Sequence, residues 1–364
     1  MKRHAPDYVI LLTVLTLAGI GVVMVFSASS VMAGLRYQNP FYYLERQAVW
    51  MLFGTVAMLV TMNVDYHKWK PFARSAFFAN LLLLVLVLIP HVGLARGGAR
   101  RWIGFGVMNF QPSELMKIAF VLFLAAVLSR DNNRLKDFWR GLMPQLVLLV
   151  VVFGLIMLEP DMGTALALAG TVVVLLFAAG ARLGHLAGLG AAAIPGLLGL
   201  IWIAPYRLRR FMSFLNPEAD PQGTGYHIIQ ALYAFGSGGL FGVGLGAGKL
   251  KFGYLPENHT DSIFAMIGEE LGFVGAVVVI VLFFLFAWRG LQVATRSPDA
   301  FGAFLAVGLT ATVAVQAFLN IAVITASIPF TGIPLPFVSY GGTNLLITMA
   351  GVGILLNVSR HSTR

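Results

Sequence analysis

The chain is built from long runs of apolar residues separated by short polar breaks. Crossing a hydrocarbon layer of about 30 Å takes about 20 helical residues, and runs near this length recur throughout the chain. They lack the alternation of a membrane barrel, and only helices or closed barrels satisfy their backbone groups in lipid. We therefore predict an all-α polytopic membrane protein with ten spans, at about 8–28, 47–62, 76–90, 111–128, 140–157, 162–180, 184–204, 262–288, 301–325 and 341–358.

The composition agrees with a membrane protein. Of the 364 residues, 58% are hydrophobic and 11% are charged, whereas soluble domains carry about 25% charged residues. The first apolar run is too long for a secretion signal, so we expect it to be retained as a helix. The chain has no cysteine, which excludes disulfides and thiolate metal sites. We expect one integral membrane domain over residues 1–364 and no nucleic-acid partner.

Lysine and arginine in the loops predict the orientation. With the N-terminus inside, the inner loops and ends hold fourteen basic residues: Lys2, Arg3, Lys68, Lys70, Arg74, Arg130, Arg134, Lys136, Arg140, Arg182, Arg289, Arg296, Arg360 and Arg364. The outer loops hold ten: Arg36, Arg46, Arg96, Arg100, Arg101, Arg207, Arg209, Arg210, Lys249 and Lys251. Both termini are therefore predicted to be cytoplasmic.

Most of the outer arginines gather in two stretches, "ARGGARRW" and "YRLRRF", which contain Arg100, Arg101 and Arg210. One interpretation is that they contact lipid headgroups. The other is that they neutralise an anionic substrate, because the arginine fork binds phosphate oxygens in pairs. The sequence leaves both interpretations open.

One connection is much longer than the others. Residues 205–261 form a large outer loop between the seventh and eighth spans, and long loops in compact bundles are usually functional or disordered. Its stretch "YHIIQALYAFGSGGLFGVG" is aromatic and apolar, which favours an ordered segment on the membrane surface. The glycines of "GVGLGAG" follow no strand and precede no Lys-Ser/Thr pair, so we do not assign a nucleotide site to them.

Four polar segments occur where spans begin or end, and the first two carry charges. In "NFQPSELMK", Glu114 and Lys117 are three residues apart on one helix face, where they either form a structural ion pair or serve a site. In "LEPDMGT", Glu159 and Asp161 flank a proline. Asp161 is placed to cap the sixth span, or the pair holds a cation or an arginine.

The third segment is "LPENHTDSIFAMIGEELG", with Glu257, His259 and Asp261 before the eighth span. Asp261 either caps that helix or serves a site, and helical spacing places Glu269 on the same side. The fourth segment, "PFTGIPLPFVSYGGTNLL", is uncharged and rich in proline, with Ser339 and Tyr340 as hydrogen-bonding groups. Irregular backbone at membrane depth must be buried or line a cavity.

All four segments face outside in the predicted topology. An outward cavity with carboxylates and arginines suits a substrate that is part lipid and part anion. A channel is expected to show rings of one charge sign, and a secondary transporter inverted repeats with polar breaks near mid-membrane. The sequence shows no obvious internal repeat.

Several motifs resemble a known family. "FQPSELMK", "LEPDMGTAL", "DPQGTGYHIIQAL", "GSGGLFGVGLG", "LPENHTDSIFAMIGEELGF" and "IPLPFVSYGGTNLL…GILLNVSR" resemble the shape, elongation, division and sporulation (SEDS) proteins, the FtsW and RodA group. The resemblance runs from about Asp7 to Arg360 and is closer to the FtsW branch. Where these relatives typically have "HTDFIFA", this chain has "HTDSIFA", so Ser262 replaces an aromatic residue beside Asp261.

The resemblance implies ten transmembrane helices and a peptidoglycan glycosyltransferase in the bacterial cytoplasmic (inner) membrane. Such an enzyme polymerises lipid II into an undecaprenyl-diphosphate-linked glycan at the outer face, beside a class B penicillin-binding protein that cross-links the peptides. By motif, the essential acid is Asp261, supported by Glu114, Lys117 and Asp161. Arg46, Arg100 and Arg101 are further residues that the resemblance suggests.

The reaction inverts an α-linked glycosyl diphosphate into a β-linked glycan in one displacement. We expect Asp261 to be the general base for the acceptor hydroxyl. The diphosphate leaving group needs charge stabilisation from Lys117, the outer arginines, or a divalent cation (magnesium or manganese) held by carboxylates. The other predicted substrate-binding residues are Arg210, Glu257, His259, Ser339 and Tyr340.

Two other functions remain open at this point. A lipid II flippase would use the same cavity and basic loops, but it would not make glycan from lipid II in detergent. A scaffold that only recruits the transpeptidase would tolerate replacement of its buried charges. Glu114 and Lys117 within a span argue against the scaffold.

Overall fold

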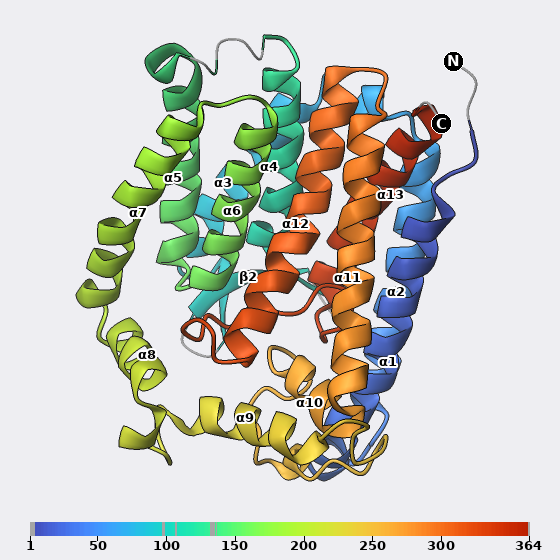
Figure 1. Cartoon of the computed structure of the whole chain (residues 1–364), viewed down its shortest axis with the longest axis vertical. Coiled ribbons are helices and arrows are strands. Elements are labelled where there is room, and N and C mark those ends of the chain that lie inside the picture. Colours follow the sequence, from blue (N-terminus) through green and yellow to red (C-terminus); the bar gives the residue numbers. More distant parts are fainter. Residues whose placement is uncertain (1–3, 97–98, 106–107, 132–134, 136, 363–364) are drawn as a thin grey trace.

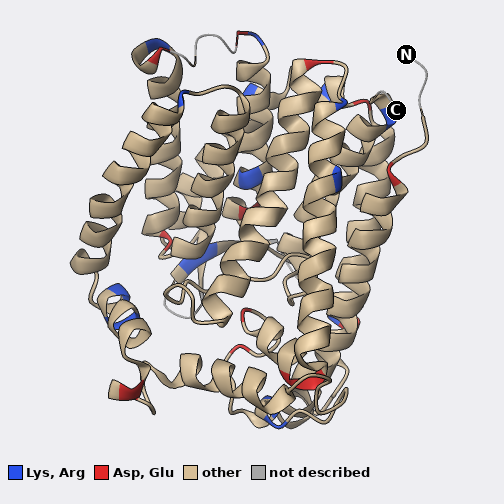
Figure 2. Ribbon diagram, viewed as in Figure 1, with Lys and Arg blue, Asp and Glu red and all other residues tan. Residues whose placement is uncertain are grey.

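The computed structural model describes residues 4–96, 99–105, 108–131, 135 and 137–362 (Figure 1). Five of the basic residues used to predict the orientation, Lys2, Arg3, Arg134, Lys136 and Arg364, lie outside the described residues. Charged residues lie mainly toward the two ends of the molecule, and few lie in its middle (Figure 2).

A bundle of antiparallel helices forms the body of the molecule (Figure 1). Its helices match the ten predicted runs: α1 (Tyr8–Tyr37), α2 (Tyr42–Asn63), α3 (Ala73–Leu88), α4 (Pro112–Leu128), α5 (Met143–Leu158), α6 (Met162–Ala178), α7 (Leu183–Ile203), α11 (Gly272–Thr295), α12 (Ala300–Ile324) and α13 (Gly342–His361). Within the described residues, six helices span a membrane by length and apolarity alone, and α3 and α6 are shorter apolar helices. The first and last described residues, His4 and Ser362, lie at one end of the bundle, here called the terminal face, and the opposite end is the loop face (Figure 1).

The bundle is packed unevenly. In α12 and α13, 72% and 78% of the most apolar stretch is buried, so these helices form the centre. In α7 the share is 6%, and this helix stands at the edge of the bundle (Figure 1). Apolar side chains of α7 such as Ile194 and Trp202 are exposed in the protein and therefore face the lipid.

The predicted eighth span is wrong at its start, because residues 262–288 form two helices. The short α10 (Ile263–Glu270) is completely buried at the loop face, and only α11 crosses the bundle (Figure 1). The break lies at Gly272, which has a φ of +69°. A Cβ atom there would lie 2.2 Å from the backbone nitrogen of Gly242, so only glycine lets the two segments approach so closely.

Helical spacing placed Glu269 on the same side as Asp261, but its contacts are with another segment. Glu269 lies at the far end of α10, where its Oε1 accepts a hydrogen bond from the backbone of Lys249 at 2.7 Å. The neighbouring Glu270 forms an ion pair with Lys251 at 3.2 Å and accepts a hydrogen bond from Ser27 at 2.5 Å. The two buried glutamates therefore fasten the preceding loop to the end of α10.

The loop face contains structure that the apolar pattern did not predict. The segment between α3 and α4 forms an antiparallel sheet in the order β1-β2-β3, from β1 (Gly93–Arg96), β2 (Ala99–Phe105) and β3 (Met108–Phe110). The long loop contains α8 (Pro205–Leu215), α9 (Tyr226–Gly238) and the short η4 (Pro217–Ala219) and η5 (Leu250–Phe252). Helices α8 and α9 lie across the loop face (Figure 1).

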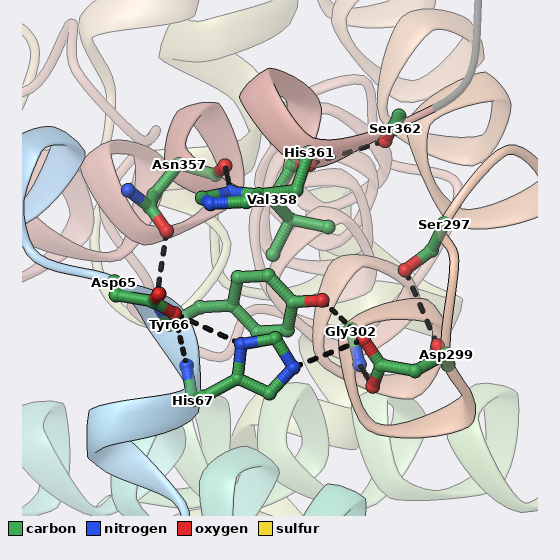
Figure 3. A network of polar contacts seen from close by, with 10 residues as sticks. All are labelled: Asp65, Tyr66, His67, Ser297, Asp299, Gly302, Asn357, Val358, His361 and Ser362. Atoms are coloured by element: carbon green, nitrogen blue, oxygen red, sulfur yellow. Dashed lines mark hydrogen bonds and ion pairs between the residues drawn. The ribbon is translucent and has the colours of Figure 1, made fainter. Parts of the chain in front are cut away.

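A network of polar contacts joins three segments at the terminal face (Figure 3). Tyr66, in the turn η1 (Tyr66–Trp69), donates a hydrogen bond from its hydroxyl to Asp299. His67 lies between Asp65, at 2.9 Å, and Asp299, at 3.3 Å. The backbone N–H of Tyr66 donates to Asn357 of α13 at 2.8 Å. The network therefore ties the α2–α3 turn to the start of α12 and to α13.

Candidate functional site

Asp261 lies in the turn before α10 and does not cap the helix. The N-cap residue is Ser262, and no side chain caps the first turn. The backbone carbonyl of Asp261 accepts a hydrogen bond from Asn320 of α12 at 2.8 Å. Its carboxylate makes no hydrogen bond to any other residue in the described ranges, and Oδ2 lies beside Gly332, 3.2 Å from where a Cβ would be. The backbone of Asp261 is thus held in place, while its carboxylate is available to contact a ligand.

The proline-rich fourth segment holds the turn that carries Asp261. Ser339 donates from Oγ to the carbonyl of Thr260 at 2.6 Å, and the backbone N–H of Tyr340 donates to the carbonyl of His259 at 2.9 Å. Asn320 also donates to the carbonyl of Ile333 at 2.7 Å. The third and fourth polar segments therefore form one unit, anchored to the central helix α12.

The side chain of Asp261 lines a cavity of about 580 Å³ at the loop face. Strand β2 contributes Arg101, helix α8 contributes Arg209 and Arg210, and helix α9 contributes His227. Glu257 also lines this cavity. The cavity therefore brings one acid, with a second carboxylate, together with three arginines that come from two elements, β2 and α8.

The surroundings of Asp261 favour a base that works near neutral pH. Burial, followed by the negative charges of Glu257 and Asp161, raises the pKa of Asp261 to about 7, although the positive charges of Arg101 and Arg210 lower it. A general base is most efficient when its pKa lies near the working pH. The position of Asp261 meets that condition.

His227 is neutral at pH 7 and contacts Ser262, the residue after Asp261. Burial and the charge of Arg210 lower the pKa of His227 to about 4. Its Nε2 lies 2.8 Å from Oγ of Ser262, which in turn donates to the carbonyl of Pro256 at 2.9 Å. Ser262 therefore links α9 to the turn that carries Asp261.

Arg101 connects the cavity to the second polar segment. Its Nε donates to the carbonyl of Glu159 at 2.9 Å, and Nη2 donates to the carbonyl of Pro160. Nη1 lies 3.9 Å from Asp161. Asp161 caps α6 by accepting from the backbone N–H of Thr164 at 3.1 Å, as the sequence suggested. Burial and the neighbouring Asp161 raise the pKa of Glu159 to about 9, so Glu159 is neutral at pH 7.

An apolar groove of about 260 Å³ borders the polar cavity. It runs between α6, α7 and α8, where Met162, Leu197 and Phe211 line it. The groove and the cavity share Tyr206, Arg210, Phe330 and Thr331. Arg210 lies over the ring of Phe330, 5.3 Å from its centroid. A molecule with a hydrocarbon tail and an anionic group fits across this boundary.

Glu114 and Lys117 lie apart from the cavity. They form an ion pair of 2.9 Å with exposures of 3% and 2%. Asn344 donates to Glu114 at 2.6 Å, and Lys117 donates to Gln316 at 2.5 Å. Gln316 in turn donates to the carbonyl of Pro334 at 2.9 Å. The pair therefore supports the fourth segment from within the bundle, and direct substrate binding by Glu114 and Lys117 stays a prediction.

The remaining predicted site residues lie outside the cavity. Arg46, His259, Ser339 and Tyr340 do not line the cavity; Arg46 lies over Tyr42, and Tyr340 packs near His259, with ring centroids 5.7 Å apart. Arg100 is exposed on β2. Because neighbouring strand residues point to opposite faces, Arg101 reaches the cavity and Arg100 does not.

The sequence reasoning missed three contributors to the site. Arg209 lies in the noted "YRLRRF" stretch but was not assigned to the site, and its place in the cavity depends on how α8 packs. His227 appears in the family-like motif "GYHIIQAL", which was the available signal. Asn320 lies near the end of the apolar helix α12, and its uncharged side chain gave no signal that it holds the Asp261 turn.

The fold and site define a class: a polytopic helical membrane protein with an acid and an arginine cluster beside an apolar groove. Family comparison agrees, because the family described as "Cell cycle protein", which comprises FtsW, RodA and SpoVE, matches residues 8–364. The chain belongs to this family.

Individual relatives are similar over nearly the whole chain. "Stage V sporulation protein E" of Bacillus subtilis strain 168 is 46% identical over 99% of this chain and 99% of its own length. "Probable peptidoglycan glycosyltransferase FtsW" of Trichlorobacter lovleyi is 48% identical over 97% of this chain and 93% of its own length. The expected closeness to the FtsW branch is consistent with these relatives.

Two solved structures share the fold. One, described as "Structural coordination of polymerization and crosslinking by a peptidoglycan synthase complex", has a TM-score of 0.80 and 31% identity, with 98% of each chain covered. The rod shape determining protein RodA of Thermus thermophilus has a TM-score of 0.73 and 29% identity, with 99% of this chain and 98% of its own covered. The predicted polytopic helical fold is therefore confirmed.

Proposed function

We propose that this chain is a peptidoglycan glycosyltransferase that polymerises lipid II, with Asp261 as the general base. Relatives that are named as probable peptidoglycan glycosyltransferases support the activity. The observation that carries the residue assignment is the cavity that Asp261 lines together with Arg101, Arg209 and Arg210. The flippase alternative is not favoured, because these relatives are named for polymer synthesis.

The protein works in the bacterial cytoplasmic membrane, with the terminal face in the cytoplasm and the loop face outside. The distribution of loop lysines and arginines supports this orientation. The substrate is lipid II, and the product is an undecaprenyl-diphosphate-linked glycan. Both carry a polyprenyl chain, which suits the apolar groove, and a diphosphate, which suits the arginines at its border.

The reaction is a single displacement. Ionised Asp261 removes the proton from the acceptor sugar hydroxyl, and the oxygen attacks the anomeric carbon of the donor as its bond to the diphosphate breaks. The proton ends on Asp261, and the negative charge ends on the departing diphosphate. Arg101, Arg209 and Arg210 stabilise that charge through paired hydrogen bonds. A positioned base contributes roughly 10²–10⁴-fold to the rate.

A divalent cation, magnesium or manganese, stays a prediction. Within the described part of the chain, no group of three or more histidines, aspartates or glutamates could hold a metal ion, but such a cation can also bind through one or two carboxylates and substrate phosphates. Asp161, beside Arg101, is already engaged by Thr164 and Gln111. In the proposed step the arginines stabilise the leaving group, and no step is routed through a metal.

A cross-linking enzyme is the proposed partner, specifically a class B penicillin-binding protein. The similar structure described as coordinating polymerization and crosslinking supports this assignment. Exposed apolar side chains at the loop face, such as Phe241 and Tyr254, provide contact area for a partner or for lipid headgroups.

The decisive experiment is Asp261→Asn in purified protein with its partner, measured as glycan chain length and amount from lipid II in detergent. We expect at least a 100-fold loss of polymer with an unchanged melting temperature or a raised one. Glu218→Gln, at an exposed carboxylate of the same long loop that does not line the cavity, is the matched control and should retain synthesis. Normal synthesis by Asp261→Asn would rule out the base role, and no polymer from the unmodified protein would return the flippase to consideration.

A further inference from the structure

A second polar cavity lies at the opposite end of the molecule from Asp261. It has a volume of about 570 Å³ and lies where α3, α4 and α5 end or begin at the terminal face. Arg74 comes from α3, Arg130 from the end of α4, and Arg140 from η3 (Phe138–Leu142). The proposed glycosyl transfer uses none of these residues.

The three arginines are available for a ligand. Within the described ranges, the guanidinium groups of Arg74, Arg130 and Arg140 make no hydrogen bond or ion pair with the protein. The cavity wall also includes Asp131, which has a contact of its own. Three cationic forks from three elements, with a single carboxylate on the wall, form an environment for an anion with several oxygens.

A buried side chain in the same cavity lacks a partner. Gln145, in the first turn of α5, is 8% exposed and lines the cavity. Its Oε1 has no hydrogen-bond partner among the described residues. Buried polar atoms are nearly always paired, so the amide oxygen indicates a ligand that donates a hydrogen bond. A hydroxyl group fits this requirement, because an ammonium group would be repelled by the arginines.

The cavity lies at the level of the membrane surface. Phe72, two residues before Arg74, is 65% exposed, and Trp139, next to Arg140, is 72% exposed. Aromatic side chains in such positions are typical of the membrane-water interface. Basic pockets between transmembrane helices on the cytoplasmic side are known to suit anionic headgroups.

We propose that this cavity binds a phosphoglycerol group, with its phosphate on Arg74, Arg130 and Arg140 and a glycerol hydroxyl on Gln145. The exposed aromatic residues favour a phospholipid headgroup, as in phosphatidylglycerol, as the source. A free glycerol phosphate would offer the same chemistry. The inference goes beyond the proposed glycosyl transfer and does not depend on it.

The test is native mass spectrometry of the purified full chain titrated with phosphatidylglycerol, with phosphatidylcholine as the zwitterionic reference. The double variant Arg130→Gln/Arg140→Gln should bind phosphatidylglycerol about 25-fold more weakly, because each basic residue near a membrane surface contributes about fivefold. The matched control, Lys68→Gln/Arg182→Gln, removes two exposed charges that do not line the cavity. It should stay within about twofold of the unmodified protein.

Two substitutions at Gln145 test the cavity without changing its arginines. Gln145→Glu should abolish preferential phosphatidylglycerol binding by placing a carboxylate beside the phosphate. Gln145→Leu should melt at a higher temperature without lipid, because it removes an unpaired buried oxygen, and should lose part of the stabilisation that phosphatidylglycerol provides. Undiminished binding by Gln145→Glu, or equal losses in the arginine double variant and its control, would overturn the proposal.

Free glycerol 3-phosphate separates the two sources. If millimolar glycerol 3-phosphate leaves the bound phosphatidylglycerol in place, the lipid headgroup is the ligand. If it displaces the lipid, the phosphate site stands and the lipid assignment is wrong. Glycan synthesis is not the readout, so failure here leaves the role of Asp261 untouched.

Discussion

A carboxylate acts as a general base only while it is ionised, and burial opposes ionisation. At Asp261 burial and two neighbouring carboxylates raise the pKa to about 7, while Arg101 and Arg210 keep it from rising further. Asp261 is therefore a stronger base than a solvated aspartate and is still substantially ionised near neutral pH. The opposing charges on the cavity wall set this balance.

The balance predicts opposite shifts in the pH dependence of two variants. For the unmodified protein, kcat/KM should rise with pH through about 7 and level off above, because only ionised Asp261 accepts a proton. Arg210→Gln removes a charge that lowers the pKa, so the rise should move to higher pH. Glu257→Gln removes a charge that raises the pKa, so the rise should move to lower pH.

The measurement is the initial rate of lipid II polymerisation between pH 5.5 and 9 (roughly the range around the pKa of about 7). Arg46→Gln is the control, because Arg46 does not line the cavity, and its profile should match the unmodified protein. Shifts in the same direction for Arg210→Gln and Glu257→Gln would contradict the electrostatic account.

At the scale of single residues, the sequence located the acid but not all of its neighbours. Asp261, Glu257, Arg101 and Arg210 stood out because charges are rare in an apolar chain, and all four line the cavity. Helical spacing, which assumed one continuous helix through residue 261, placed Glu269 on the same side as Asp261, but its contacts are with another segment. His227 and Asn320 carry no formal charge, and only the packing of α9 and α12 reveals their contacts.

At the scale of elements, apolar runs predict spans well and predict breaks within them poorly. The buried α10 is as apolar as a spanning helix, so the pattern merges it with α11. The sheet β1-β2-β3 is short and includes polar residues, so hydropathy does not distinguish it from a loop. Both elements help shape the loop face: β2 carries Arg101, and α10 directly follows the Asp261 turn.

The break before α11 predicts a sensitive position. Gly272→Ala should lower the free energy of unfolding by about 1–3 kcal/mol, because alanine at a φ of +69° is strained and its Cβ would meet the backbone of Gly242. Glycan synthesis should fall as well, because α10 positions Asp261. Thermal unfolding in detergent and polymerisation of lipid II measure the two effects.

Gly236→Ala in α9 is the control for that substitution. No atom lies within 4 Å of a Cβ built at Gly236, and alanine favours helices, so stability should be equal or slightly higher. Equal stability of Gly272→Ala and the unmodified protein would show that the segments around Gly272 and Gly242 can move apart without loss of free energy of unfolding.

At the scale of the whole molecule, the terminal face is held by the network around Tyr66 (Figure 3). Burial alone would raise the pKa of Asp299, but hydrogen bonds from Tyr66 and Gly302 and the charge of His67 lower it overall. A carboxylate with a lowered pKa stabilises the fold while it is ionised, and this contribution is lost as the pH falls through the folded-state pKa. The network should therefore weaken only in acid.

Tyr66→Phe removes the hydroxyl that binds Asp299. The variant should lose about 1 kcal/mol of stability at pH 7.5, a modest value because Asp299 is about one third exposed. The deficit should shrink as the pH falls below about 4, the ordinary range of an aspartate, and should vanish once the pH is below the lowered pKa that Asp299 has in the unmodified protein. Melting temperatures across this pH range measure it, and Tyr8→Phe, at an exposed tyrosine of the same face, should show no deficit. A deficit that is constant with pH would mean that the charge of Asp299 is not involved.

Because little of α7 is covered by protein, the surrounding bilayer should affect the shape of the site. With only 6% of its most apolar stretch covered by protein, this helix takes its position largely from acyl chains, and it forms one wall of the groove beside the arginines. The thickness and fluidity of the membrane should therefore help set the width of this groove, where we propose that the polyprenyl chain binds. Detergent replaces those acyl chains with a solvent of different shape, so turnover measured in micelles and in nanodiscs should differ even when every side chain is the same.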